Sequence, residues 1–130
     1  MNNLRVNKDR LWQSLMEMAK IGATDKGGCK RLAATALDGQ ARDLFVEWCK
    51  DEGCTISIDK MGNIFARREG NNSQLPAVVT GSHLDTQPTG GKFDGVFGVL
   101  AGLEVLRTLN ENNVKTNAPF EFTVWTNEEG

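Results

Sequence analysis

Apolar residues recur at helical spacing in two stretches of the first half of the chain. Residues 9–21 carry an apolar stripe that stops at Gly22, which predicts a helix packed against a core rather than a ligand-binding surface. A second helix is expected from Asp38, as its N-cap, to a stop at Gly53. The two stripes consist of Leu11, Trp12, Leu15, Met16, Met18 and Ala19, and of Ala41, Leu44, Phe45, Trp48 and Cys49. Residues 23–37, rich in small side chains, are expected to form an exposed connecting loop.

Alternation of apolar and polar residues replaces the helical pattern after this second helix. Residues 55–59 alternate Ile56 and Ile58 with polar side chains, and the Met-Gly-Asn sequence at 61–63 predicts a turn. Residues 64–67 then continue the alternation. This arrangement predicts a β-hairpin with one buried face.

The second half of the chain predicts a strand, a helix and another strand. Residues 77–80 are apolar without alternation, which is typical of a strand covered on both faces. Residues 96–109 carry a helical stripe that contains Gly98 and Gly102, and glycines spaced in this way favour a helix backbone packed closely on a sheet. Residues 119–126 alternate again. The order predicts a right-handed βαβ unit. We therefore expect an α/β fold, with a mostly parallel sheet, flanking helices and an antiparallel hairpin.

Composition narrows the class of protein. The 130 residues are 39% hydrophobic and 25% charged, which is ordinary for a soluble globular domain. A net charge of −2 argues against nucleic acid or an anionic membrane as partner, and no apolar run is long enough to span a bilayer. The three cysteines are odd in number and form no Cys-x-x-Cys pair. We interpret them as reduced, structural thiols of a cytoplasmic protein.

Candidate chemistry is concentrated after the two strands of the βαβ unit. The glycine-rich loop at 81–95 contains His83, the only histidine of the chain, together with Asp85 and Asp94. Glu128 and Glu129 follow the last predicted strand. Functional groups of open α/β sheets gather beyond the carboxyl ends of the strands, so these residues are expected at one edge. Imidazole and carboxylate are ligands of zinc and neighbouring divalent metals, and the sequence therefore predicts a metal site.

Each of these residues also has an ordinary structural explanation. A lone histidine is more often structural than a metal ligand, and Asp94 precedes a helix, where it is a possible N-cap. The two glutamates are compatible with a solvated turn. Their expected convergence at one sheet edge favours the metal site over these separate explanations.

The adjacent glutamates suit two different tasks. Neighbouring side chains of an extended backbone point in opposite directions, so one carboxylate can bind a metal while the other faces a substrate. Water bound to a metal has its pKa lowered to about 7 and still needs a base to accept its proton. Two metals about 3.5–4 Å apart need a bridging ligand, for which Asp94 is the candidate.

Three motifs resemble those of the aminoacylase/carboxypeptidase superfamily of dinuclear zinc amidohydrolases. They are Gly-Ser-His-Leu-Asp-Thr from position 81, Gly-Gly-Lys-Phe-Asp-Gly-Val-Phe-Gly-Val from position 90, and Asn-Glu-Glu-Gly from position 127. Asp-Gly-Gln-Ala-Arg-Asp from position 38, Met-Gly-Asn-Ile-Phe-Ala-Arg-Arg-Glu-Gly from position 61 and Trp-Thr before the last motif are similar to one branch. That branch holds the N-carbamoyl-L-amino-acid hydrolases, β-ureidopropionases and allantoate amidohydrolases.

The resemblance implies a role for each candidate residue. His83 corresponds to the ligand of one metal, Asp94 to the bridging ligand and Glu129 to a ligand of the other metal. Glu128 corresponds to the catalytic glutamate, which moves a proton from the bridging water to the leaving nitrogen. Asp85 resembles the aspartate that supports the site and orients the histidine. The resemblance also implies a cis peptide bond between Asp94 and Gly95.

The resemblance implies hydrolysis of a linear amide C–N bond in a small carbamoyl or ureido compound. N-carbamoyl-L-amino acids, β-ureidopropionate and allantoate are the candidate substrates, with two divalent ions, Zn or Mn, Co or Ni, as cofactors. An aminoacylase or dipeptidase of the same superfamily is the first alternative. The second is a non-catalytic α/β module that retains the motifs without binding metal.

The resemblance further implies that residues 1–130 are the N-terminal part of a catalytic domain. A lid and dimerisation domain, two further ligand histidines and the contacts to a substrate carboxylate are then expected outside this chain, and the full-length protein is expected to be a homodimer. We expect the chain alone to bind metal weakly and to lack activity. We also expect its last strand to expose Phe120, Phe122, Val124 and Trp125 in part.

Overall fold

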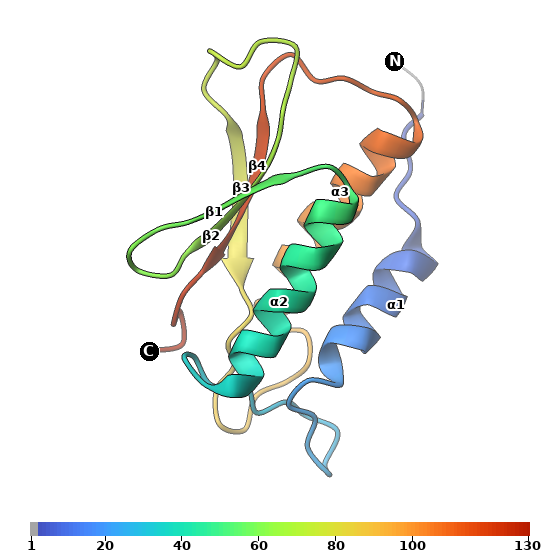
Figure 1. Ribbon diagram of the computed structural model, residues 1–130. Coiled ribbons are helices and arrows are strands. Elements are labelled where there is room, and N and C mark those ends of the chain that lie inside the picture. The colour runs from blue at the N-terminus through green and yellow to red at the C-terminus, as the bar shows by residue number, and fades with distance from the viewer. Residues whose placement is uncertain (1–2) are drawn as a thin grey trace.

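The computed structural model describes residues 3–130, which form three helices and four strands (Figure 1). The elements are α1 (Lys8–Ala19), α2 (Ala36–Asp51), β1 (Thr55–Ile58), β2 (Ile64–Arg68), β3 (Val78–His83), α3 (Val96–Glu111) and β4 (Phe120–Trp125). Each corresponds to an element expected from the sequence, which confirms the α/β class. Helix α3 packs on β3 and β4, α2 contacts β1, and α1 packs against α3, so the helices gather beside the sheet.

The four strands form one sheet in the order β1-β2-β4-β3. Strand β3 pairs with β4 in parallel, whereas β1 with β2 and β2 with β4 pair antiparallel. The predicted hairpin and the strand-helix-strand unit are both present. The expected predominance of parallel pairs is absent, because the antiparallel hairpin extends the same sheet beside β4.

The core lies between the sheet and the helices. The apolar stripe of α3 is buried as predicted, and Phe45 of α2 meets Phe122 of β4 edge to face with ring centroids 6.0 Å apart. Both glycines of α3 face the sheet: a Cβ at Gly98 would lie 2.8 Å from the Cβ of Ser82, and one at Gly102 would lie 3.3 Å from Thr80 Cγ2. The close helix-to-sheet packing inferred from these glycines is therefore confirmed.

Strand β3 lies at an edge of the sheet, and the expectation that both of its faces are covered is wrong. Val78 and Val79 are 61% and 55% exposed, because β3 pairs with β4 alone within residues 3–130 and helices do not cover its outer positions. Strand β4 is interior, so the expectation that Phe122 and Val124 are exposed is wrong; both are buried. Trp125, at the end of β4, is exposed as expected.

Three expectations for the first 40 residues are also corrected. The 23–37 loop is exposed over much of its length, as expected, but Cys29 is buried and forms isolated β-bridges with Ala23 and Gly90, so the loop is anchored to the rest of the fold. The N-cap of α2 is Thr35, whose hydroxyl accepts the backbone N–H of Asp38, while the buried Asp38 carboxylate accepts that of Ala34. Trp12 is exposed rather than part of the core.

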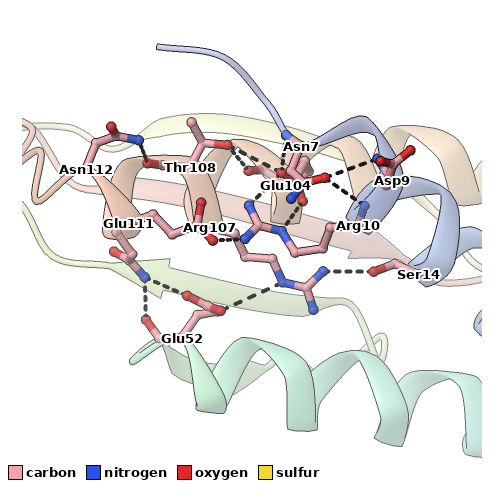
Figure 2. Close-up of polar contacts among 11 residues, drawn as sticks. Asn7, Asp9, Arg10, Ser14, Glu52, Glu104, Arg107, Thr108, Glu111 and Asn112 are labelled. Atoms are coloured by element: carbon pink, nitrogen blue, oxygen red, sulfur yellow. Dashed lines mark hydrogen bonds and ion pairs between the residues drawn. The ribbon is translucent and has the colours of Figure 1, made fainter. Parts of the chain in front are cut away.

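A buried ionic cluster joins the helices (Figure 2). The carboxylate of Glu104, on α3, is almost inaccessible and accepts hydrogen bonds from the Arg10 guanidinium and from the backbone N–H of Asn7. Burial alone would raise the pKa of Glu104, but these hydrogen bonds outweigh it and lower the pKa. Arg107 donates to Ser14 of α1 and lies 3.8 Å from Glu52, which follows α2. The cluster fixes α1 and the end of α2 on α3.

All three cysteines are free and buried, as expected of structural thiols. Burial raises the pKa of the Cys49 thiol above its ordinary range and that of Cys54 to about 11, so both thiols stay protonated at neutral pH. None of the helices within residues 3–130 has the length and apolar character needed to cross a membrane.

The glycines of the helices provide a test of the packing. Gly98→Ala should lower the free energy of unfolding by about 1–3 kcal/mol, because the new methyl group would press on Ser82 in the adjoining strand. Gly39→Ala, in α2, is the matched control: its Cβ would meet nothing within 4 Å, so it should stabilise by about 0.5–1 kcal/mol. Urea denaturation measures both. Equal stabilisation by the two substitutions would contradict the packing.

Candidate metal centre

The parallel register of β3 and β4 sets the position of the candidate site. His83 is paired with Trp125, and these are the last residues of the two strands. The segments that follow therefore leave the sheet at the same edge. Ligand atoms of His83, Asp94 and Glu129 lie within 4.8 Å of one another there. The structure thus brings together the three predicted metal ligands from three separate segments.

His83 presents one ring nitrogen to the site. The ring is buried, and Nδ1 lies 2.9 Å from the backbone carbonyl of Asp85. A carbonyl can only accept, so in the neutral ring Nδ1 holds the proton and Nε2 keeps its lone pair for a metal. Nε2 lies 3.3 Å from Oε2 of Glu128 and so points toward the carboxylates. Both ring nitrogens therefore have an oxygen neighbour, and the role of His83 as a metal ligand stays a prediction.

Asp85 links the two segments beneath the site. Its carboxylate is buried and accepts the backbone N–H of Glu128 at 3.3 Å and that of Glu129 at 3.1 Å. Its contact with His83 runs through its backbone carbonyl, whereas Oδ1 lies 3.6 Å from Nδ1. Asp85 therefore holds both the ring and the backbone of the two glutamates, and its functional role stays a prediction.

Asp94 and Glu129 supply the carboxylates of the cluster. The N-cap of α3 is Gly95 and no side chain caps this helix, so the explanation of Asp94 as an N-cap is wrong. Oε2 of Glu129 accepts a hydrogen bond from Nε2 of Gln87 at 3.0 Å. Sequence reasoning missed Gln87, because an amide in an exposed loop carries no pattern that marks it.

Gly95 is required by the approach of the His83 ring. Its φ is +70°, and a Cβ there would lie 2.5 Å from both ring nitrogens. The expected cis peptide bond between Asp94 and Gly95 is wrong: no peptide bond within residues 3–130 is cis. Glycine at this position is explained by the positive φ and by the close approach of the imidazole.

Two further segments support the loop that carries the glutamates. The Arg42 guanidinium lies 3.4 Å from the Thr126 hydroxyl and also donates to the carbonyl of Gly62. The side-chain oxygen of Asn63 accepts the backbone N–H of Thr126 at 2.8 Å. Helix α2 and the hairpin turn therefore both hold residue 126, just before the acidic pair.

The donor set fits a divalent metal ion. One imidazole nitrogen and two carboxylates within 4.8 Å match the ligands preferred by zinc and its neighbours. A cleft of about 320 Å³ adjoins the cluster, which is enough for a small ligand. Its lining includes Leu32, Ala33, Asp85, Gln87, Asn127 and Glu129.

Known proteins are similar to this chain in sequence and in fold. The sequence model described as "Peptidase family M20/M25/M40" matches residues 79–130, the part that holds the candidate ligands. An N-carbamoyl-L-amino-acid amidohydrolase of Rhizobium meliloti is 56% identical over 128 residues, covering 98% of this chain and 31% of the relative. Residues 79–130 thus match this family, and nearly the whole chain is similar to an N-carbamoyl-L-amino-acid amidohydrolase. The resemblance to the N-carbamoyl-L-amino-acid hydrolase branch is confirmed.

Two further known proteins are similar over nearly the whole chain. An N-carbamoyl-L-amino acid amidohydrolase of Geobacillus stearothermophilus is 43% identical over 125 residues, covering 96% of this chain and 31% of the relative. The crystal structure of a hydantoinase/carbamoylase family amidase from Burkholderia ambifaria superposes with a TM-score of 0.98 at 57% identity, over 99% of this chain and 32% of that one. The chain thus spans about a third of the length of these relatives.

Gly95 provides a test of the site geometry. Gly95→Ala should weaken zinc binding at least tenfold, since its methyl group would displace the His83 ring. Gly91→Ala, in the same loop, would meet nothing within 4 Å and should leave zinc affinity unchanged. Competition with a chromophoric chelator measures the affinity, and circular dichroism confirms that both variants fold. Unchanged affinity in Gly95→Ala would exclude His83 as a ligand.

Proposed function

We propose that this chain carries the metal-binding edge of an amidohydrolase that cleaves a linear C–N bond in a carbamoyl or ureido compound. The observation that carries the proposal is the convergence of His83, Asp94 and Glu129 within 4.8 Å, with Glu128 beside the imidazole. Two relatives named N-carbamoyl-L-amino-acid amidohydrolase support the choice of substrate class.

The proposal gives the five residues distinct tasks. His83, Asp94 and Glu129 would hold two divalent ions, with Asp94 shared. Asp85 would keep the imidazole and the backbone of the two glutamates in place. The ions, when bound, supply polarisation of the substrate carbonyl and acidification of water. Zn, Mn, Co and Ni all suit this donor set.

Glu128 is the proposed proton carrier. Its carboxylate is largely exposed, and Oε2 lies 3.3 Å from Nε2 of His83, so it stands at the ligand cluster with its backbone held by Asp85. It takes a proton from the attacking water as the oxygen bonds to the carbonyl carbon. It then gives that proton to the nitrogen as the C–N bond breaks, and the amine or ammonia leaves.

A second candidate reaction is cleavage of an N-acyl or peptide bond by an aminoacylase or dipeptidase. The description of the matched family as peptidases favours it. Both reactions use the same ligands and the same proton carrier. They differ in the group attached to the carbonyl, which a substrate panel distinguishes.

The first functional prediction separates proton transfer from metal binding. In the full-length protein, meaning the translated reading frame that contains these residues, Glu128→Gln should retain the bound metal. Its turnover should fall by about 10²–10⁴-fold, because the amide cannot accept the proton. Asp94→Ala should lose metal instead. Mass spectrometry measures the metal content of each variant, and turnover is measured on an N-carbamoyl amino acid. The opposite pattern, metal lost in Glu128→Gln and kept in Asp94→Ala, would overturn these roles.

The second functional prediction concerns the substrate. We expect the full-length protein to hydrolyse N-carbamoyl-L-amino acids, β-ureidopropionate or allantoate at least tenfold faster than N-acyl amino acids or dipeptides. Chelation of the metal should abolish the activity. Faster cleavage of dipeptides would favour the peptidase alternative, and no metal binding at all would favour a non-catalytic module.

The third concerns the 130 residues alone. They contain a single histidine, and only three ligand side chains converge in the described part. We therefore expect weak zinc binding and no turnover on the same panel. Turnover of about 1 s⁻¹ or more, in the range of ordinary enzymes, would show that the chain needs no further ligands.

A further inference from the structure

Arg31 is a buried charge that the proposed chemistry does not use. It lies in the loop between α1 and α2, and only 1% of the residue is exposed. Within residues 3–130 no carboxylate lies within 4.0 Å of its guanidinium. Burial lowers the pKa of the guanidinium. The carboxylates of Asp38 and Asp85, which lie farther away, raise this pKa but do not outweigh burial. A buried charge is costly unless dipoles or partners compensate it, so this arginine needs an explanation.

The side chain bridges α1 and the segment that follows β3. Its Nε donates to the carbonyl of Leu84 at 2.9 Å, and Nη1 donates to the carbonyls of Ile21 at 2.5 Å and Met18 at 3.2 Å. The last two carbonyls lie at the C-terminal end of α1, where the helix dipole favours a cation. The planar guanidinium thus connects two segments in fixed directions.

The backbone of Arg31 holds the same segment a second time. Its N–H donates to the hydroxyl of Thr86 at 2.7 Å, and its carbonyl accepts the N–H of Thr86 at 2.8 Å. Contacts from one residue therefore fix positions 84 and 86, on either side of Asp85. Asp85 in turn holds the His83 ring and the backbone of both glutamates.

We propose that Arg31 is a positioning residue of the metal centre. By fixing Leu84 and Thr86, it sets the orientation of Asp85, and through Asp85 it sets the tautomer of His83 and the place of the acidic pair. The inference rests on the proposed function for its purpose. Lysine cannot replace it, because one ammonium group does not reproduce the directions of Nε and Nη1.

The single histidine makes this inference directly measurable. In ¹⁵N NMR of the folded, metal-free chain at a pH where the ring is neutral, the wild type should show the Nδ1–H tautomer. Arg31→Lys should shift His83 toward a mixture of tautomers and weaken the affinity for zinc at least tenfold. Thr86→Val removes the acceptor of the Arg31 N–H and keeps the side-chain shape. It should change the His83 tautomer and the affinity for zinc in the same direction as Arg31→Lys does. This second variant tests the inference if Arg31→Lys does not fold.

Arg107→Lys is the matched control. Arg107 is half-buried, and burial lowers its pKa as it does that of Arg31, but Arg107 contacts Ser14 and Glu52. It lies about 16 Å along α3 from Val96, at the metal-site end of the helix, at 1.5 Å per residue. It should destabilise the fold without changing the His83 tautomer or the affinity for zinc.

Three results would overturn the inference. The first is an Nε2–H tautomer in the wild type. The second is a zinc affinity unchanged within twofold, with an unchanged tautomer, in Arg31→Lys or, if that variant does not fold, in Thr86→Val. The third is an equal change of tautomer and zinc affinity in Arg107→Lys. Failure of the proposed function would look different. In that case the full-length protein would turn over none of the substrates, while the response of His83 to Arg31→Lys would remain.

Discussion

The parallel pairing of β3 with β4 is the constraint on which the candidate metal centre depends. Because His83 is in register with Trp125, the histidine loop and the acidic pair leave the sheet together. Helix α3 connects the two strands, and it begins at the same edge, directly after Asp94 and Gly95. The loop at 81–95 and the acidic pair, which are distant in sequence, therefore meet at one edge.

The site is supported from behind by backbone contacts more than by ion pairs. The Asp85 carboxylate accepts two backbone N–H groups, and Arg31 donates to backbone carbonyls. Such bonds fix the path of the chain and leave the ligand carboxylates available. The other buried charge cluster, Glu104 with Arg10, has a different task, since it fixes α1 on α3.

The branch-specific motifs gain a physical meaning from these contacts. Arg42, in the motif from position 38, and Asn63, in the motif from position 61, both contact Thr126. These residues are far from the ligands in the sequence, yet they hold the loop that carries the acidic pair. The motifs of the branch therefore describe the support of the site as well as its ligands.

The sequence by itself determined the elements and the candidate ligands. Periodicity located the seven helices and strands of the described part, and residue types marked the acidic residues and the histidine after two of the strands, because both signals are local. The family resemblance then singled out His83, Asp94 and Glu129 as the predicted ligands. Only the tertiary structure decided what depends on contacts between distant segments. It placed β3 at an edge and β4 inside, buried Arg31 beneath Asp85, and showed that Gly95 makes room for the imidazole. Strand order and close approach depend on partners that no local pattern specifies.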